Sequence, residues 1–213
     1  MTNTSSHFFE LKNYKTIIFD FDGVILDSNS IKKLAIQSSV ENILDEVTTK
    51  EFVDYFVNLN GVPREQKIAK YLPVAEHNNV LKNYEEILDV NLKDANLICG
   101  VKELIQNLYA LKIKLYVLSG GAQIEVINLL KFFGLFNYFD GVFGGPKNKE
   151  QNLEHIKLEK PVLYFGDSKV DYAVSKEHHF DFVFVYGASS IKNWQDETKN
   201  WDISRIIKNF REL

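Results

Sequence analysis

The sequence has little cysteine: Cys99 is the only one, so the 213-residue chain cannot form an internal disulfide bond. Basic residues are not in excess, with 25 lysines and arginines against 29 aspartates and glutamates, so we do not expect nucleic acid as a partner. The continuous apolar runs, such as 182–186, have only strand length and are too short to cross a membrane. Residues 1–10 have neither the basic start nor the apolar core of a signal peptide. These absences predict a cytoplasmic protein.

The composition is that of an ordinary globular protein, with 45% hydrophobic and 25% charged residues. Its length allows one large domain, or a main domain that carries a smaller insert. We expect residues 1–13 to form a loosely held arm before the first strand. The sequence is compatible with a monomer or a homodimer.

The spacing of apolar residues divides the chain into two parts. Residues 28–95 show helical spacing, with breaks at Pro63 and Pro73, and contain no convincing strand. From Gly100 onward, helical patterns alternate with short apolar runs typical of buried strands, and the apolar residues of 203–210 predict a final helix. This alternation favours an α/β fold, with a parallel sheet covered by helices on both faces. Five strands are predicted, at 16–19, 115–118, 141–143, 161–165 and 182–186.

The first predicted strand, residues 16–19, is followed by two aspartates. Because side chains alternate in an extended segment, Asp20 and Asp22 leave its carboxyl end on roughly the same side, and Gly23 allows a sharp turn beyond them. Open α/β sheets bind ligands at this end of their strands. Neighbouring carboxylates repel each other, so a cation or a shared proton must compensate them. We interpret the pair as part of a metal site.

Chemically functional residues also follow the other predicted strands. The second strand ends at Ser119-Gly120-Gly121, the third leads to Lys147 and Lys149, and the fourth ends at Asp167, with Asp171 one helical turn later. Because the strands are parallel, these groups are expected at one common edge of the sheet. Each signal alone is typical of a turn or a helix cap, but their joint occurrence in this order favours a phosphate-transfer site.

The four segments Asp-Phe-Asp-Gly-Val, Leu-Ser-Gly, a lysine after Gly-Pro, and Gly-Asp-Ser-Lys-Val-Asp resemble the motif pattern of the haloacid dehalogenase superfamily. More narrowly, the chain resembles the phosphoglycolate-phosphatase-like branch, which has a helical cap of the C1 type after the first motif. The resemblance spans residues 15–187. It implies a Rossmann-like core domain of residues 1–27 and 96–213, and an all-helical cap domain of residues 28–95 that determines specificity.

The resemblance also implies catalytic and metal-binding roles. Asp20 would be the nucleophile that forms an aspartyl-phosphate, and Asp22 would protonate the leaving oxygen and later deprotonate the attacking water. This role requires a partly protonated Asp22 beside an ionised Asp20. Asp20, Asp167 and the backbone carbonyl of Asp22 would bind Mg²⁺, and Asp171 would hold a metal-bound water or orient the lysine. Like charges ~4 Å apart cost about 4 kcal/mol per pair at an effective dielectric constant near 20, so such a cluster needs cations.

The phosphoryl group would be bound by residues of the second and third motifs. Ser119 and the amides near Gly120 would donate hydrogen bonds to it, and a lysine would neutralise its remaining charge. We favour Lys149 for that role over Lys147, with Lys169 as the third candidate, on the spacing after Gly-Pro.

The predicted function is therefore that of a magnesium-dependent phosphatase acting on a small phosphate monoester, either a sugar phosphate or a phosphoglycolate-like metabolite. Asp22 argues against a dehalogenase of the founding type, in which no alcohol leaving group needs a proton. One alternative is a phosphomutase of the β-phosphoglucomutase type, although Gly166-Asp167 stands where such mutases usually have Glu-Asp. A catalytically silent binding or scaffold module is an alternative from another class. Arg64 either binds an anionic group of the substrate or begins an exposed helix.

Overall fold

A six-stranded parallel sheet forms the centre of the protein in the computed structural model, which describes residues 11–213. The strand order is β3-β2-β1-β4-β5-β6, so the first strand lies in the middle and the chain winds outward in both directions from it. All adjacent strands are parallel. The strands are β1 (Thr16–Phe19), β2 (Lys114–Ala122), β3 (Gly141–Gly145), β4 (Val162–Gly166), β5 (Asp181–Val185) and β6 (Arg205–Ile207).

The predicted α/β fold is confirmed, but the sheet has one strand more than expected. The final helix predicted around residues 203–210 is wrong, because Arg205–Ile207 form β6 and pair in parallel with β5. Two adjacent β-branched residues, Ile206 and Ile207, suit an edge strand, and the open edge of β5 provides unpaired backbone groups for them. Pairing with β5 therefore determines the structure of this segment, which is too short for the spacing of its apolar residues to distinguish a helix from a strand.

Helices cover both faces of the sheet because its central strands are apolar on both sides. Ile17 and Phe19 of β1 pack in one core cluster with α6 (Val101–Ala110) and α7 (Gln123–Phe132). Ile18 faces the other way and packs in a second cluster with α8 (Lys149–Leu153) and α9 (Lys169–Glu177). The chain also contains α10 (Trp194–Glu197) and the 3-10 helices η1 (Leu92–Asp94), η2 (Phe136–Tyr138) and η3 (Phe210–Glu212).

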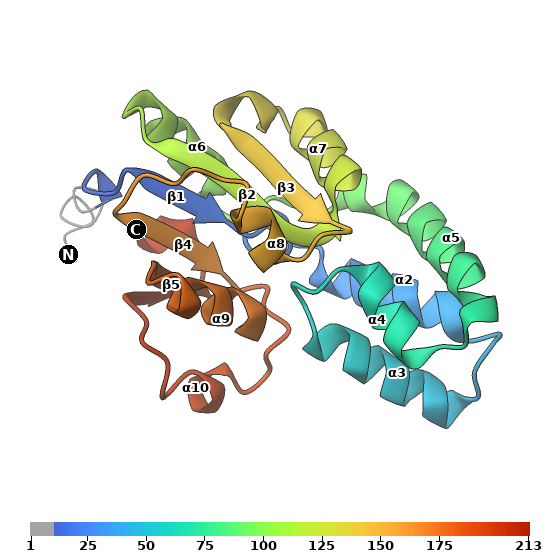
Figure 1. The fold of residues 1–213 in the computed structure, drawn as a ribbon. Helices are drawn as coiled ribbons and strands as arrows, with labels where there is room; N and C mark the ends of the chain where they lie inside the picture. The colour runs from blue at the N-terminus through green and yellow to red at the C-terminus, as the bar shows by residue number, and fades with distance from the viewer. Residues whose placement is uncertain (1–10) are drawn as a thin grey trace.

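Four helices between β1 and α6 form a separate group, which we call the inserted helices. Figure 1 shows the strand arrows of the sheet pointing toward this group, so it lies at the carboxyl edge of the sheet. The predicted breaks are present, since Pro63 and Pro73 are the N-cap residues of the third and fourth of these helices. The inserted helices are α2 (Asn29–Val40), α3 (Glu46–Asn58), α4 (Arg64–Tyr71) and α5 (Val74–Asn91).

Between residues 11 and 213, no helix combines the length and the apolar character that crossing a membrane requires. The predicted arm at residues 1–13 lies, up to residue 10, outside the described part of the chain.

Candidate active site

The ends of β1 and β4 bring Asp20 and Asp167 together. These two strands are neighbours in the sheet with Phe19 opposite Phe165, and the amide of Asp20 donates a 2.9 Å hydrogen bond to the carbonyl of Phe165. Both aspartates are almost fully buried, at 3% and 1% exposure. Gly23 adopts a φ of +78°, and a Cβ atom there would collide with the carboxylate of Asp167, so the turn after β1 requires glycine.

Asp171 joins this pair from the first turn of α9. The side chain of Ser168 caps the helix, and the Asp171 carboxylate in turn accepts a hydrogen bond of 3.0 Å from the Ser168 amide, which completes a capping box. Carboxylate oxygens of Asp20, Asp167 and Asp171 all lie within 4.8 Å of one another. The local helix start therefore fixes the third carboxylate of the cluster.

Lys149 is the cation of this cluster. It lies in the first turn of α8, where Asn148 and Gln151 form a second capping box. Its Nζ lies 2.8 Å from Oδ1 of Asp20 and 3.1 Å from the hydroxyl of Tyr164, and it also contacts Oδ1 of Asp171 closely. The side chain is 1% exposed.

The two other candidate lysines lie elsewhere. Lys147 is exposed, and Lys169 is exposed and forms an ion pair of 2.6 Å with Glu197. Neither is an ion-pair partner of Asp20 or Asp171 within residues 11–213. The geometry therefore supports Lys149 as the favoured lysine.

The three carboxylates carry more negative charge than Lys149 compensates. Burial, together with the charge of Asp171, raises the pKa of Asp20 to about 7, although Lys149 acts in the opposite direction. Burial and the charge of Asp20 raise the pKa of Asp167 well above its ordinary value. Oδ2 of Asp20 and Oδ1 of Asp167 form no hydrogen bond with another residue of the described chain. Buried oxygen ligands with uncompensated negative charge fit a hard divalent cation.

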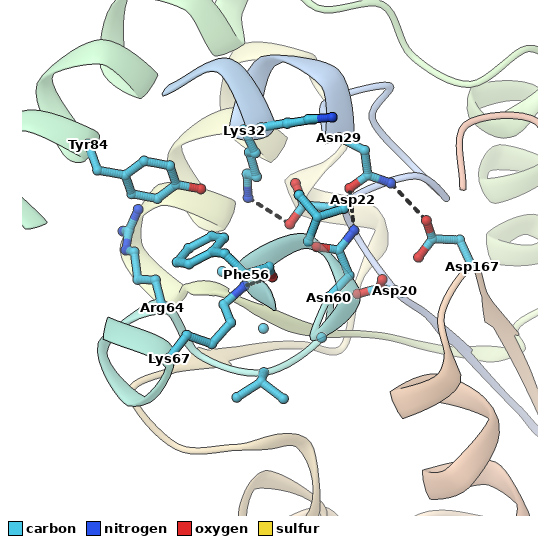
Figure 2. A pocket seen from close by; sticks show the side chains of 16 residues that line it. Asp20, Asp22, Asn29, Lys32, Phe56, Asn60, Arg64, Lys67, Tyr84 and Asp167 are labelled. Carbon is cyan, nitrogen blue, oxygen red and sulfur yellow. Dashed lines mark hydrogen bonds and ion pairs between the residues drawn. The ribbon is translucent and has the colours of Figure 1, made fainter. Parts of the chain in front are cut away.

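Asp22 belongs to a different set of contacts. Its carboxylate accepts a hydrogen bond of 2.6 Å from the hydroxyl of Ser28. It also accepts one of 2.7 Å from Nζ of Lys32, in α2 (Figure 2). Burial tends to raise the pKa of Asp22, but Lys32 and Ser28 outweigh it and hold the pKa below its ordinary value. The pKa of Asp20 is thus raised and that of Asp22 lowered, which is opposite in direction to what the predicted roles require. Lys32, which was not among the predicted site residues, is the main cause of the lowered pKa of Asp22.

The second predicted motif lies at the same edge, where β2 meets the inserted helices. Ser119 is fully buried, and its Oγ accepts a 2.9 Å hydrogen bond from the amide of Gly121. Gly120 lies against the backbone of Gly61, in the break between α3 and α4: a Cβ atom on Gly120 would be 2.5 Å and 2.6 Å from C and O of Gly61. Two glycines thus permit close contact between the sheet edge and the inserted helices.

Several side chains of the site were missed in the sequence. Asn29 donates a 2.8 Å hydrogen bond to Oδ2 of Asp167, and the hydroxyl of Tyr164 donates one of 2.8 Å to Asp171. Lys67 is buried beside Phe56 in the cavity next to Asp22 (Figure 2). None of these residues belongs to a motif. A tyrosine within an otherwise apolar buried strand was the one available signal, because its hydroxyl needs a partner there.

Comparison with known proteins agrees with this arrangement. The sequence pattern of a family described as haloacid dehalogenase-like hydrolase matches residues 17–185. By sequence search, no curated protein matches the chain.

Solved structures of similar fold come from several bacteria. A haloacid dehalogenase-like hydrolase from Bacteroides fragilis has a TM-score of 0.75 at 18% identity, with 94% of this chain and 100% of that chain covered. A predicted phosphoglycolate phosphatase from Haemophilus somnus has a TM-score of 0.71 at 20% identity, with 92% and 95% covered. The hydrolase YfnB from Bacillus subtilis, bound to magnesium, has a TM-score of 0.65 at 20% identity, with 93% and 96% covered. At these identities the likeness shows a shared fold. The family pattern spans most of the chain and includes both β1 and β4, and the protein belongs to the haloacid dehalogenase-like hydrolases.

Proposed function

We propose that the protein is a magnesium-dependent phosphatase that hydrolyses a small phosphate monoester through an aspartyl-phosphate on Asp20. The observation that carries the proposal is the buried cluster at the ends of β1 and β4, in which Asp20 is paired with Lys149 and adjoins Asp167. Membership of a hydrolase family supports it. An acidic cluster next to a buried lysine is suited to binding an anion and a cation together.

Asp20 would attack phosphorus in line, so that a bond forms between its Oδ and phosphorus while the bond to the leaving oxygen breaks. Asp22 would pass a proton to that oxygen, so it must bind a proton before the bond breaks, against the influence of Lys32, whose ammonium 2.7 Å away favours the ionised form. Water would then attack phosphorus of the aspartyl-phosphate and lose a proton to Asp22, while the bond between phosphorus and Asp20 breaks and phosphate is released. Lys149 would neutralise phosphoryl charge, and Asp171 would hold the lysine in place.

Asp20 and Asp167 are the side chains that would hold Mg²⁺, together with the backbone carbonyl of Asp22. The fit rests on the uncompensated charge of the cluster and on the free carboxylate oxygens of both residues. When bound, the ion would supply positive charge that keeps Asp20 ionised and stabilises the phosphoryl oxygens.

The inserted helices would form a cap, approximately residues 28–95, over the leaving group. Their support for this role is the contact of Gly61 with Gly120 and of Lys32 with Asp22, both at the edge where the reaction would occur. The cap would exclude water from the leaving group and select the metabolite.

The test is phosphate release from para-nitrophenyl phosphate and from a panel of small phosphate monoesters with Mg²⁺. We expect Asp20→Asn to lower the rate by about 1000-fold or more, because the amide cannot act as nucleophile. Asp27→Asn is the matched control: it makes the same substitution at an exposed position of the same loop and should retain activity.

Equal rates for the wild-type protein and Asp20→Asn would exclude this mechanism. Conversion of a phosphosugar to its isomer without free phosphate would instead identify a mutase. Removal of the metal with a chelator should abolish activity, and addition of Mg²⁺ should restore it.

A further inference from the structure

The cavity beside Asp22 is lined both by Asp20, Asp22 and Asp167 and by several cations of the inserted helices. It has a volume of about 40 Å³, which is room for a few water-sized groups. Figure 2 shows Lys32, Arg64 and Lys67 projecting toward it from α2 and α4, with Tyr84 and Phe56 beside them. The inserted helices therefore bring three cations to a small cavity that Asp20 and Asp22 also line.

Two of these cations are compensated within the protein. Lys32 pairs with Asp22 at 2.7 Å and with Glu125 at 3.3 Å. Arg64 pairs with Glu125 at 2.9 Å and with the half-exposed Glu85 at 3.5 Å. Arg64 does begin α4, but it is only 6% exposed, so the helix start is buried rather than exposed. Its charge is compensated by carboxylates.

Lys67 is the exception. It is 5% exposed, and within residues 11–213 no carboxylate lies within ion-pair distance of its Nζ. The Nζ donates a 3.1 Å hydrogen bond to the carbonyl of Phe56 and lies 3.5 Å from the centre of that residue's ring. Burial, with the charge of Lys32 next, lowers the pKa of Lys67 to about 7. A buried ammonium is costly unless a negative group compensates it, and Asp22 and Glu65 act on Lys67 only from beyond ion-pair distance.

The position of Lys67 indicates which part of a substrate it would meet. Asp20, Asp22 and Lys67 all line the same cavity, and Asp22 acts electrostatically on both Asp20 and Lys67. The proposed mechanism places the phosphoryl group at Asp20 and the leaving oxygen at Asp22. The remainder of the leaving group then extends toward Lys67.

We propose that Lys67 binds a negatively charged group on the leaving group of the substrate, so that the enzyme prefers phosphate esters whose alcohol carries a carboxylate or a second phosphate. This inference rests on the proposed phosphatase function. The small cavity suits an alcohol of a few carbon atoms.

The competing explanation is structural. Phe56 belongs to the last turn of α3, where a lysine can stabilise a free carbonyl and the negative end of the helix. In that case Lys67 would affect all substrates equally. The test must therefore compare charged with neutral leaving groups.

Two matched ester pairs make that comparison: 2-phosphoglycolate with 2-hydroxyethyl phosphate, and 3-phosphoglycerate with glycerol 3-phosphate. Ethylene glycol bisphosphate distinguishes a second phosphate from a carboxylate. We expect the full-length protein with Mg²⁺ to prefer the anionic member of at least one pair in kcat/KM by tenfold or more. Lys67→Met should reduce this preference by about 10- to 100-fold, the usual range for a lost charge-assisted hydrogen bond.

Lys70→Met is the control, because it removes an exposed lysine one turn later in α4 and should keep the preference. Wild-type protein without a preference in any comparison would overturn the inference, and so would a Lys67→Met variant that slows both members of each pair equally.

A binding measurement separates this inference from the proposed function. Calorimetric titration of Asp20→Asn with the same anionic esters should give a Kd at least tenfold lower than that of the double variant Asp20→Asn, Lys67→Met. Absence of phosphate release from every ester would refute the phosphatase proposal, whereas equal Kd values in this titration would refute the role of Lys67.

Discussion

The carboxyl edge of the sheet and the inserted helices, which meet at Asp22, compensate their charges differently; we call them the acidic side and the cationic side. On the acidic side, three buried carboxylates share one ammonium group within residues 11–213, that of Lys149. On the cationic side, Lys32 and Arg64 pair with carboxylates, whereas the buried Lys67 has none within ion-pair distance in the described chain. One side is built on strand ends and helix caps, and the other on side chains from the faces of helices. The acidic side therefore has excess negative charge, and the cationic side leaves one buried cation unpaired among the described residues.

The largest expected effect comes from removing the one cation of the acidic side. Lys149→Met leaves Asp20 and Asp171 buried without their partner, so we expect the unfolding free energy to fall by about 3–5 kcal/mol and phosphate release to be lost. Denaturant unfolding and a phosphate assay measure the two effects. Lys147→Met removes an exposed lysine of the same loop and should change stability by about 0.5 kcal/mol or less. Comparable losses in both variants would contradict the assigned importance of the buried cluster.

A second variant separates the two sides physically. The Cβ atom of Gly120→Ala would lie 2.5 Å from backbone carbon of Gly61, so the sheet edge and the inserted helices must move apart. We expect kcat/KM to fall by about 30-fold, because small misplacements of catalytic groups are costly. Gly145→Ala is the control, since its Cβ would lie at ordinary contact distance, with the nearest atom at 3.5 Å. Unchanged kinetics in Gly120→Ala would mean that this contact is not needed for activity.

The pH dependence of stability tests the charge of the cationic side. The pKa of Lys67 is lowered from 10.5 to about 7 in the folded state, so between these pH values the unfolded chain binds more protons and stability rises with pH. We expect the unfolding free energy of the wild-type protein, relative to Lys67→Met, to increase by about 1–2 kcal/mol from pH 7 to pH 9. The charged groups that act on Lys67 in this comparison are Lys32, Asp22, Arg64 and Glu65. Denaturation curves of both proteins at several pH values measure the difference, and parallel profiles would exclude a lowered pKa.

The smallest expected effect comes from removing a carboxylate from the cationic side. Glu125→Gln removes the carboxylate shared by Lys32 and Arg64, so the cationic side becomes more positive. We expect a two- to threefold lower KM for esters with an anionic leaving group, with a loss of stability of about 1 kcal/mol. Glu85→Gln alters a more exposed partner of Arg64 and should change little. A higher KM in Glu125→Gln would show that Glu125 mainly positions the two cations.

Strand ends were predictable from sequence, whereas contacts across the cavity were not. Asp20 and Asp167 follow apolar runs, and parallel pairing of those runs brings them together with few alternatives. Lys149 was favoured over Lys147 on spacing, and the structure places Lys149 in the cluster. The final segment was predicted incorrectly because β6 is a three-residue strand whose pairing depends on the edge of β5. The contact that lowers the pKa of Asp22 was not predicted, because Lys32 is ten residues away in a helix with no motif.

Local sequence was enough to predict the alternation of strands and helices, the insertion after the first strand, and the acidic and hydroxyl groups at the strand ends. These features follow from the periodic spacing of apolar residues and from the residues next to each strand. The packing of the helices against the sheet was needed to show which side chains contact Asp22, which cations pair with carboxylates, and that Lys67 pairs with none among residues 11–213. The physical reason is that helical spacing shows which residues are buried together, but the partner that a buried charge meets depends on how separate helices pack against the sheet.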